Sequence, residues 1–231
     1  MNAVISWSGG KDSCLALYRA ISQGINVTHM LNFISEDAVM TMSHCPDPIL
    51  IRAHAAALDL SLVQKWVTWD TYEQRFRDAL KELKLRGVDT LINGDIDLSE
   101  GVAWNWKMCR DTGIRPVMPL QNADPERLLT EFIKAGFKAI IVCVDAGTPA
   151  REWLGEEIDI SFLARLHSEP AGTIHFCGEL GEFHTLVTDG PIFTNRIEIL
   201  ESRTMDIAGY SYLDILRYKV VTKEGKYNVT R

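Results

Sequence analysis

The sequence predicts an α/β fold in which a parallel sheet covered by helices is followed by a smaller α+β lobe. Through the first 145 residues, short apolar runs alternate with amphipathic stretches, which is typical of strand-helix-strand units. After about residue 146, Gly, Pro and Asp interrupt short apolar segments, which indicates a mixed architecture. With 231 residues the chain can bury a full core, and we expect two domains, at 1–146 and 147–231.

Strands are expected where apolar runs of strand length are bounded by turn residues. The run NAVISW opens the chain, and the β-branched run at 139–144 is typical of a strand buried in a parallel sheet. The expected strands are 2–7, 27–34, 61–67, 90–93 and 139–144, with an extended segment at 116–119.

Helices are expected where apolar residues recur every three or four positions. Phe76, Leu80 and Leu83 follow this spacing most clearly. Gly24 and Gly87 stand where helices of the first domain should end, since glycine readily adopts the left-handed conformation of a helix C-terminus. The expected helices are 13–23, 48–60, 71–86, 102–112 and 125–135, with a further helix at 161–167.

The C-terminal stretch YLDILRYKVVTKEGKYNVTR, residues 212–231, has two apolar segments separated by KEGK. This pattern predicts a β-hairpin whose turn is KEGK.

Composition narrows the classes of function. The formal net charge is -7 and no window concentrates Lys or Arg, so the sequence gives no direct sign of binding to nucleic acid or to a membrane. No run of 18 apolar residues and no leader-like N-terminus are present, and we expect a cytoplasmic protein. The odd count and wide spacing of the cysteines argue against a disulfide framework, and most should be buried thiols: Cys14, Cys45, Cys109, Cys143 and Cys177.

The most specific motif is SGGKDS at residues 8–13, between the first strand and the first helix. Glycines let backbone N–H groups converge, the helix N-terminus adds partial positive charge, and Lys11 adds a full charge, so the motif predicts an anion site for phosphate. It is not a Walker A loop, because the spacing differs and Asp12 follows the lysine. The plainer alternative is a strand-helix turn with a solvated lysine.

A second group of polar residues lies in HFCGELGEFHTLVTDGPIF, residues 175–193. The stretch offers two carboxylates and a histidine suited to acid–base work, at Glu179, Glu182 and His184. Two alternatives remain open. One is a strand pair with solvated carboxylates, and the other is a metal site that would add His175 and Cys177, although the spacing fits no familiar zinc pattern.

Both motifs resemble those of a known family. SGGKDS resembles the PP-loop of ATP pyrophosphatases, which cleave ATP between the α and β phosphates. CGELGEFHT, followed by DGP, is similar to the CGENGEFHT signature of the diphthine–ammonia ligase family, a PP-loop branch. The resemblance covers residues 1 to about 200, and the sequence departs from the signature at Phe176 and Leu180.

The resemblance implies a Rossmann-like ATP-binding domain and an AMP-forming ligase. In that family a carboxylate attacks the α phosphorus of ATP, and ammonia then displaces AMP to leave an amide. The nucleotide-binding residues implied are Ser8, Gly9, Gly10, Lys11, Asp12, Ser13, His44, Gly94 and Asp95, with Asp12 also a ligand for Mg²⁺. The catalytic residues implied are Lys11, Asp12, Glu179, Glu182 and His184, of which Glu179 or Glu182 would bind ammonium and accept its proton.

The partners implied are ATP, ammonium and a carboxylate acceptor, which would be elongation factor 2 carrying diphthine if the source makes diphthamide. Alternatives are another small carboxylate, an RNA-modifying PP-loop enzyme, or a module that binds ATP or AMP without turnover; a homo-oligomer is left open. Independently of the family, Asp95 and Asp97 follow a strand at its C-terminal end, where open α/β sheets bind ligands. The tryptophans Trp66, Trp69, Trp104 and Trp106 are interpreted as core or domain-contact residues.

Overall fold

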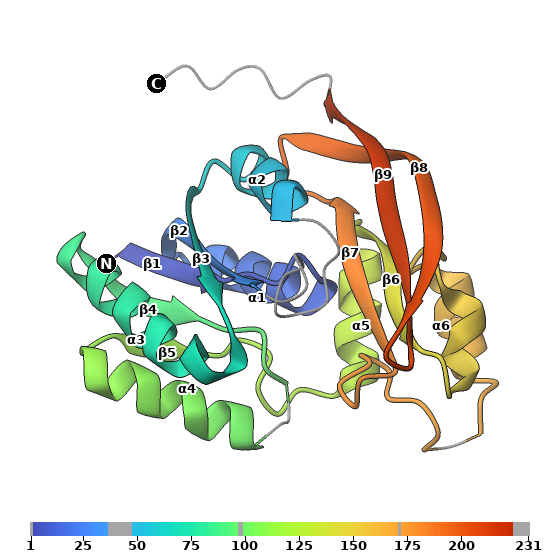
Figure 1. The fold of residues 1–231 in the computed structure, drawn as a ribbon, viewed down its shortest axis with the longest axis horizontal. Helices are drawn as coiled ribbons and strands as arrows, with labels where there is room; N and C mark the ends of the chain where they lie inside the picture. Colours follow the sequence, from blue (N-terminus) through green and yellow to red (C-terminus); the bar gives the residue numbers. More distant parts are fainter. Residues whose placement is uncertain (1, 37–47, 97–98, 171, 224–231) are drawn as a thin grey trace.

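The computed structural model describes residues 2–36, 48–96, 99–170 and 172–223 and contains two sheets (Figure 1). The first sheet is parallel, with five strands in the order β3-β2-β1-β4-β5. The second is antiparallel, with four strands in the order β7-β6-β9-β8. The predicted fold class is confirmed.

The first sheet and its helices alternate along the chain as expected. The strands are β1 (Asn2–Ser6), β2 (Asn26–Ser35), β3 (Ser61–Val67), β4 (Val88–Ile92) and β5 (Arg115–Val117). The helices are α1 (Lys11–Ser22), α2 (Pro48–Ala57), α3 (Trp69–Leu85) and α4 (Ser99–Thr112). Among the described residues, no helix has the length and apolar character that crossing a membrane requires.

Alternation along β1 places the helices in two layers. Ala3 and Ile5 are fully buried in one cluster with residues of α1 and α2, whereas Val4 is buried in a second cluster with residues of α3 and α4. A strand covered on both faces in this way belongs at the centre of a doubly wound sheet. The order 3-2-1-4-5 reverses direction between β1 and β4, and that reversal is where such sheets bind ligands.

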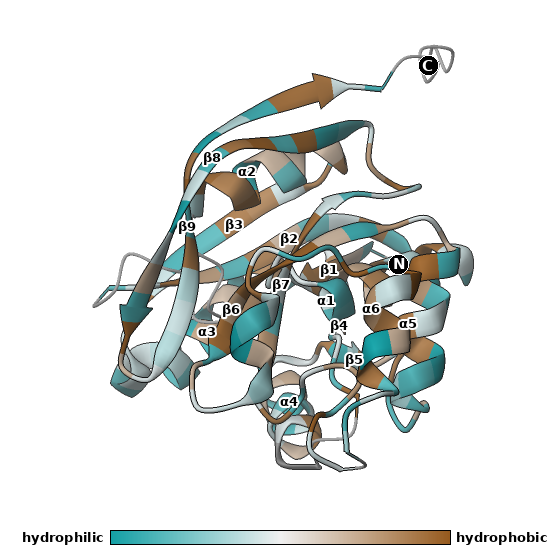
Figure 2. Cartoon of the chain, turned by 90° about the vertical axis from the view of Figure 1, so that its right-hand side faces the viewer, coloured by the Kyte–Doolittle hydropathy of each residue, from teal (hydrophilic) through white to brown (hydrophobic). Residues whose placement is uncertain are grey.

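The second lobe is built from α5 (Pro125–Lys134), β6 (Lys138–Asp145), a short 3₁₀ helix η1 (Pro149–Trp153), α6 (Ile160–Leu166), β7 (Phe183–Asp189), β8 (Asn195–Ile207) and β9 (Tyr210–Thr222). β8 starts against α2, because the Thr194 amide donates to the Ala57 carbonyl at 2.8 Å. Figure 2 shows hydrophobic and hydrophilic segments alternating along the β8–β9 hairpin, as a half-exposed sheet requires.

One strand prediction is wrong. The run at 139–144 was expected in the parallel sheet, but β6 pairs antiparallel with β7 and β9. β6 is almost wholly buried, and a buried antiparallel strand has the same apolar pattern as a buried parallel one. The domain division after residue 146 stays a prediction. β6 precedes that position in the chain but belongs to the second, antiparallel sheet.

The C-terminal hairpin expected at KEGK stays a prediction, and the structure shows a different hairpin just before it. Residues 210–222 form one continuous strand, and the hairpin joins β8 to β9 through Ala208 and Gly209, which have φ values of 52° and 88°. Cross-strand pairing with β8 extends along β9 as far as Thr222, just before the predicted turn. Residues 224–231, which hold most of KEGK, lie outside the described residues.

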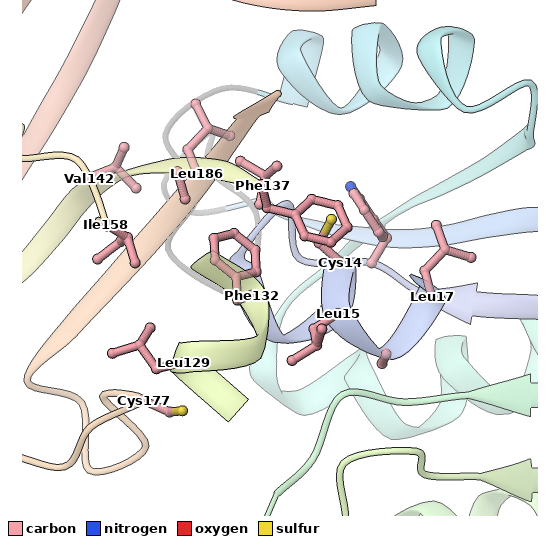
Figure 3. Packing of buried hydrophobic residues seen from close by; sticks show 14 of the residues in the cluster. Cys14, Leu15, Leu17, Leu129, Phe132, Phe137, Val142, Ile158, Cys177 and Leu186 are labelled. Carbon is pink, nitrogen blue, oxygen red and sulfur yellow. The ribbon is translucent and has the colours of Figure 1, made fainter. Parts of the chain in front are cut away.

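The two lobes share one core through α1 (Figure 3). Cys14 and Leu15 of α1 lie with Phe132 of α5 and with Val142 and Leu186 of the second sheet in a single buried cluster. Each fully buried Leu or Phe contributes about 1.5–3 kcal/mol relative to an exposed one. The helix that follows the glycine loop is therefore held from both lobes.

Candidate functional site

The loop between β1 and α1 is shaped by glycine and two serines. Gly9 has φ of +88°, in the left-handed region that favours glycine. Ser8 Oγ accepts from the Gly10 amide at 3.1 Å and lies 3.0 Å from Ser13 Oγ, which donates to the Gly10 carbonyl. Gly10 is the N-cap of α1 and has no side chain to cap the first turn, so the helix N-terminus can face an anion.

Residues of the second lobe hold this loop in place. The Val187 amide donates to the Gly9 carbonyl at 2.9 Å, and the Lys11 amide donates to Thr185 Oγ1 at 3.0 Å. Lys11 Nζ donates to the Cys177 carbonyl and, at 2.8 Å, to Asp12 Oδ2. The two predicted motifs therefore lie against each other.

Lys11 is a buried cation, with 4% of its surface exposed. Burial opposes its charged form, but the nearby Asp12, Cys177 and Glu179 favour it more strongly, so the pKa of Lys11 lies above its ordinary value. Lys11 therefore keeps its positive charge at neutral pH at the junction of the lobes.

At Gly94 the backbones approach too closely for a side chain, and at Gly10 the space for one is tight. A Cβ on Gly94 would lie 2.9 Å from both the Asp12 carbonyl carbon and the Ser13 amide nitrogen, and a Cβ on Gly10 would lie 3.2 Å from the Thr185 oxygen. The segment after β4 is thereby packed directly against the first turn of α1.

A cleft of about 460 Å³ opens at the edge of the first sheet where the segments after β1 and β4 diverge. This is the reversal point of the strand order, where doubly wound sheets bind nucleotides. The cleft is lined by Ser6, Trp7, Ser8, Asp12, Ser13, Leu31, Asn32, Phe33, Trp69, Tyr72, Asn93, Gly94, Asp95, Glu179 and His184.

Polar groups of the cleft are poised for a ligand. Burial, together with the charge of Asp12, raises the pKa of Asp95, although a hydrogen bond from Asn105 Nδ2 at 2.5 Å opposes that shift. Asn93 is 5% exposed, and its Nδ2 has no hydrogen-bond partner in the described part of the chain. Because buried amides are normally satisfied, Asn93 Nδ2 marks a position where it could donate a hydrogen bond to an oxygen of a ligand.

One wall of the cleft is aromatic. Trp69 is 74% exposed, and its ring centroid lies 6.4 Å from that of Tyr72, which packs on Phe33 at 5.1 Å. Burial raises the pKa of Tyr72 to about 12, with a further contribution from Asp95, so its hydroxyl is neutral at physiological pH. An exposed indole beside a polar cleft suits stacking on a planar ring.

The loop at 175–182 is organised by Glu182 and His175. Glu182 is 5% exposed, and its carboxylate accepts from the His175 amide at 2.7 Å and the Leu180 amide at 3.1 Å. His175 Nδ1 in turn accepts from the Cys177 amide at 3.1 Å. Gly178 has φ of +69°, and a Cβ there would lie 2.5 Å from the Phe183 carbonyl oxygen.

This folding directs other side chains of the loop toward α1. Glu179 and His184 line both the main cleft and a neighbouring pocket of about 150 Å³ that Lys11, Gly10 and Thr185 also line. The arrangement brings a carboxylate and an imidazole next to the glycine loop.

The structure brings most of the sequence-predicted site residues together. Those that line the cleft or the small pocket are Ser8, Gly10, Lys11, Asp12, Ser13, Gly94, Asp95, Glu179 and His184. Glu182 lines neither cavity, because its carboxylate binds backbone amides. His44 and Asp97 lie outside the described residues.

Two further interpretations can be compared with the geometry. Within the described ranges, no group of three or more His, Cys, Asp or Glu side chains is placed to hold a metal ion, so the metal alternative for 175–184 is not supported there. Trp104 packs on Tyr72 and Phe76, as expected. Trp66, Trp69 and Trp106 are 49%, 74% and 55% exposed, so the core half of the interpretation is wrong for them, and the alternative of a domain contact stays a prediction.

Sequence reasoning missed a buried histidine behind the cleft. His54 of α2 is 1% exposed, its Nδ1 accepts from Trp7 Nε1 at 3.2 Å, and its Nε2 donates to the Val187 carbonyl at 2.7 Å. Trp7 lines the cleft, so His54 joins the cleft floor to the second lobe. A lone histidine in an alanine-rich helix carries no sequence signal for this role. Asn93 and Asn105 were missed as well, because neither belongs to a motif that the sequence analysis identified.

The fold and the cleft define a Rossmann-like α/β protein with a glycine-rich anion loop at the switch point of its sheet. The chain belongs to the diphthamide synthase family: the model of the diphthamide synthase N-terminal domain matches residues 1–116, and that of the C-terminal domain matches residues 124–221.

Three curated relatives are each named diphthine–ammonia ligase. The protein of Schizosaccharomyces pombe is 27% identical over 86% of this chain, which spans only 36% of that protein's length. The Mus musculus protein is 26% identical, with 86% of this chain and 82% of its own length covered, and the Danio rerio protein is 24% identical, with 96% of each covered. A structure of a predicted tRNA methyltransferase subunit from Methanocaldococcus jannaschii covers 83% of this chain and 98% of its own, with 15% identity and a TM-score of 0.45, too distant a likeness to bear on function.

Proposed function

We propose that the chain is an ATP-dependent ligase that converts a carboxylate to an amide with ammonia and releases AMP and pyrophosphate. The acceptor proposed is the diphthine carboxylate of elongation factor 2, in keeping with the names of its relatives. The observation that carries this proposal is the contact of two polar loops. The glycine loop at 8–13 lies directly against the loop that presents Glu179 and His184.

The first half of the reaction belongs to the cleft. The triphosphate would lie across the N-terminus of α1, with the Ser8 and Ser13 hydroxyls and Lys11 beside it, because these groups supply partial and full positive charge for the departing pyrophosphate. Trp69 would stack on the adenine, and the Asn93 amide would bind an oxygen of the nucleotide. An oxygen of the acceptor carboxylate attacks the α phosphorus, and the bond from that phosphorus to the bridging oxygen of pyrophosphate breaks.

The donor set fits Mg²⁺ without a dedicated protein cage. Asp12 and Asp95 both line the cleft and lie close enough that the charge of Asp12 helps to raise the pKa of Asp95. Mg²⁺ is commonly bound through one or two carboxylates together with substrate phosphates and waters. When bound, it would neutralise charge that develops on the phosphates.

The second half of the reaction belongs to the small pocket. Ammonia attacks the carbonyl carbon of the acyl adenylate, the bond to AMP breaks, and the nitrogen loses a proton. Glu179 would hold ammonium by charge. Glu179 or His184 would take the two protons that the nitrogen loses, one to free ammonia from ammonium and one after the attack. Glu182 would act by fixing the loop, since both of its oxygens already accept backbone hydrogen bonds. We place the reaction in the cytoplasm, where the buried free thiols Cys14, Cys109, Cys143 and Cys177 would stay reduced.

The test is AMP release from ATP and Mg²⁺ with ammonium, measured with and without elongation factor 2 carrying diphthine. We expect release that depends on the acceptor, and an amide on the product by mass spectrometry. Lys11→Ala should abolish release. ATP binding without acceptor-dependent AMP would contradict the proposal and favour a module that binds nucleotide without turnover.

A further inference from the structure

A second groove lies outside the cleft, between α4 and the edge strand β5. Its volume is about 660 Å³, and none of the residues that line the cleft takes part in it. The residues that carry the argument are Trp106, Lys107, Arg110, Ile114, Arg115 and Pro116. β5 is the last strand of its sheet, so the groove lies at an edge of that sheet; Figure 1 shows the ribbons of β5 and α4.

The groove has an apolar floor with an aromatic wall. Ile114 is 3% exposed at its base, and Pro116 lies beside it on the edge strand. Trp106 is 55% exposed although the same helix buries Met108 and Cys109 fully. A large exposed indole next to an apolar floor is typical of a surface that receives an apolar side chain of a partner.

The rim of the groove is cationic. Lys107, Arg110 and Arg115 line it, and no Asp or Glu does. Arg115 forms no ion pair within the described parts of the chain. This concentration of positive charge contrasts with the net charge of -7 of the whole chain.

Carboxylates near the rim pair with only part of its positive charge. Lys107 pairs with Glu73 at 3.0 Å, and Arg110 Nε lies 4.0 Å from Asp111, whose carboxylate is already bound by Arg77. Arg110 and Arg115 therefore keep guanidinium donors for an external anion, and planar guanidinium groups bind carboxylates well.

We propose that this groove docks an acidic segment of the protein acceptor, with an apolar side chain against Trp106 and carboxylates on Arg110 and Arg115. The inference rests on the proposed function, because that reaction needs a protein acceptor. α4 itself joins the two sites: Asn105 binds Asp95 of the cleft, while Trp106 faces the groove. Residues 103–110 span about 10 Å of helix. A partner docked in the groove would therefore be separated from the cleft only by α4.

An RNA partner fits the groove less well. Nucleic-acid affinity comes largely from many phosphate contacts, and three cations on an otherwise acidic chain supply few. The mostly apolar floor suits a hydrocarbon side chain rather than a sugar-phosphate backbone.

The experiment compares the KM for diphthine-bearing elongation factor 2 among wild type, Trp106→Ala and the double variant Arg110→Glu/Arg115→Glu, with AMP release as the readout. Both variants should raise that KM by roughly tenfold, because charge reversal and loss of the indole each remove a docking contact. The Kd for ATP and the Tm should not change. Arg75→Glu is the matched control, since Arg75 is an exposed cation on α3 outside the groove.

The outcomes separate this inference from the proposed function. An unchanged acceptor KM in both groove variants, with wild-type AMP release intact, overturns the docking site and leaves the ligase standing. No acceptor-dependent AMP from the wild type overturns the ligase and the docking site with it. Loss of binding to a single-stranded RNA oligonucleotide in the groove variants, with the acceptor KM unchanged, would reassign the groove to RNA and also overturn the proposal.

Discussion

His54 makes the stability of the fold depend on pH. Its ring is buried between two hydrogen-bond partners whose roles cannot change. The Trp7 indole can only donate a hydrogen bond and the Val187 carbonyl can only accept one. Only the neutral ring with its proton on Nε2 satisfies both. Burial lowers the pKa of His54 to about 4, and the hydrogen bond to Val187 opposes that shift only in part.

The size of the effect follows from linkage. In the unfolded chain the neutral imidazole of His54 takes up its second ring proton near pH 6.5, whereas in the folded chain it does so near pH 4. The unfolded state binds more protons between these values, so the stability contributed by neutral His54 is complete above pH 6.5 and is lost as pH falls toward 4. Between pH 7.5 and 5 the loss amounts to about 2 kcal/mol of unfolding free energy.

The assay is urea unfolding at pH 7.5 and pH 5 for the wild type and His54→Gln. Glutamine can still donate one hydrogen bond but cannot be protonated, so the variant should be less stable at pH 7.5 and should lose about 2 kcal/mol less than the wild type on acidification. His167→Gln is the control with the opposite sign. The Leu163 carbonyl and then Glu126 raise the pKa of His167. Removing the His167 imidazole should therefore not reduce the loss of unfolding free energy on acidification. Equal losses in wild type and His54→Gln would refute the reasoning.

Three other substitutions test the site. Gly94→Ala should lower the unfolding free energy by about 1–3 kcal/mol and weaken ATP binding, because its Cβ would meet the backbone of Asp12 at 2.9 Å; a stable variant with normal affinity contradicts this close approach. Glu182→Gln should lower Tm and amide formation while ATP binding persists. The glutamine side chain has one acceptor oxygen, and its NH₂ group cannot accept the second backbone hydrogen bond. An unchanged Tm would show that Glu182 does not hold the loop in place. Trp69→Ala should weaken ATP binding about tenfold by calorimetry and leave Tm unchanged, and equal affinity would exclude stacking.

Strand and helix positions could be predicted where the signal was local. The spacing of Phe76, Leu80 and Leu83 and the glycine at 87 placed α3 within two residues of its observed start. The partner of a strand is not a local property, however. β6 has the apolar pattern of a parallel strand, and only contacts with β7 and β9 decide its sheet. The turn at Ala208 was missed because alanine seldom adopts positive φ.

The site was predictable to the extent that it rests on motifs. SGGKDS and CGELGEFHT pointed to the residues around the two cavities, and their adjacency is a finding of the structure. The individual roles of those residues stay predictions. Glu182 could not be separated from Glu179 in sequence, because both are glutamates beside glycine, and only the hydrogen bonds of Glu182 distinguish them. Trp69 was misjudged because tryptophan is usually buried.

The contacts from the second lobe to the glycine loop also set an order in time. The Lys11 amide and the Thr185 hydroxyl that accepts from it are 174 positions apart, and the separation between Gly9 and Val187 is similar. During synthesis β1, α1 and β4 leave the ribosome long before β7 exists, so the early chain carries the loop residues without the groups that fix them. The glycine loop therefore reaches its final set of contacts only after β7 has been synthesised.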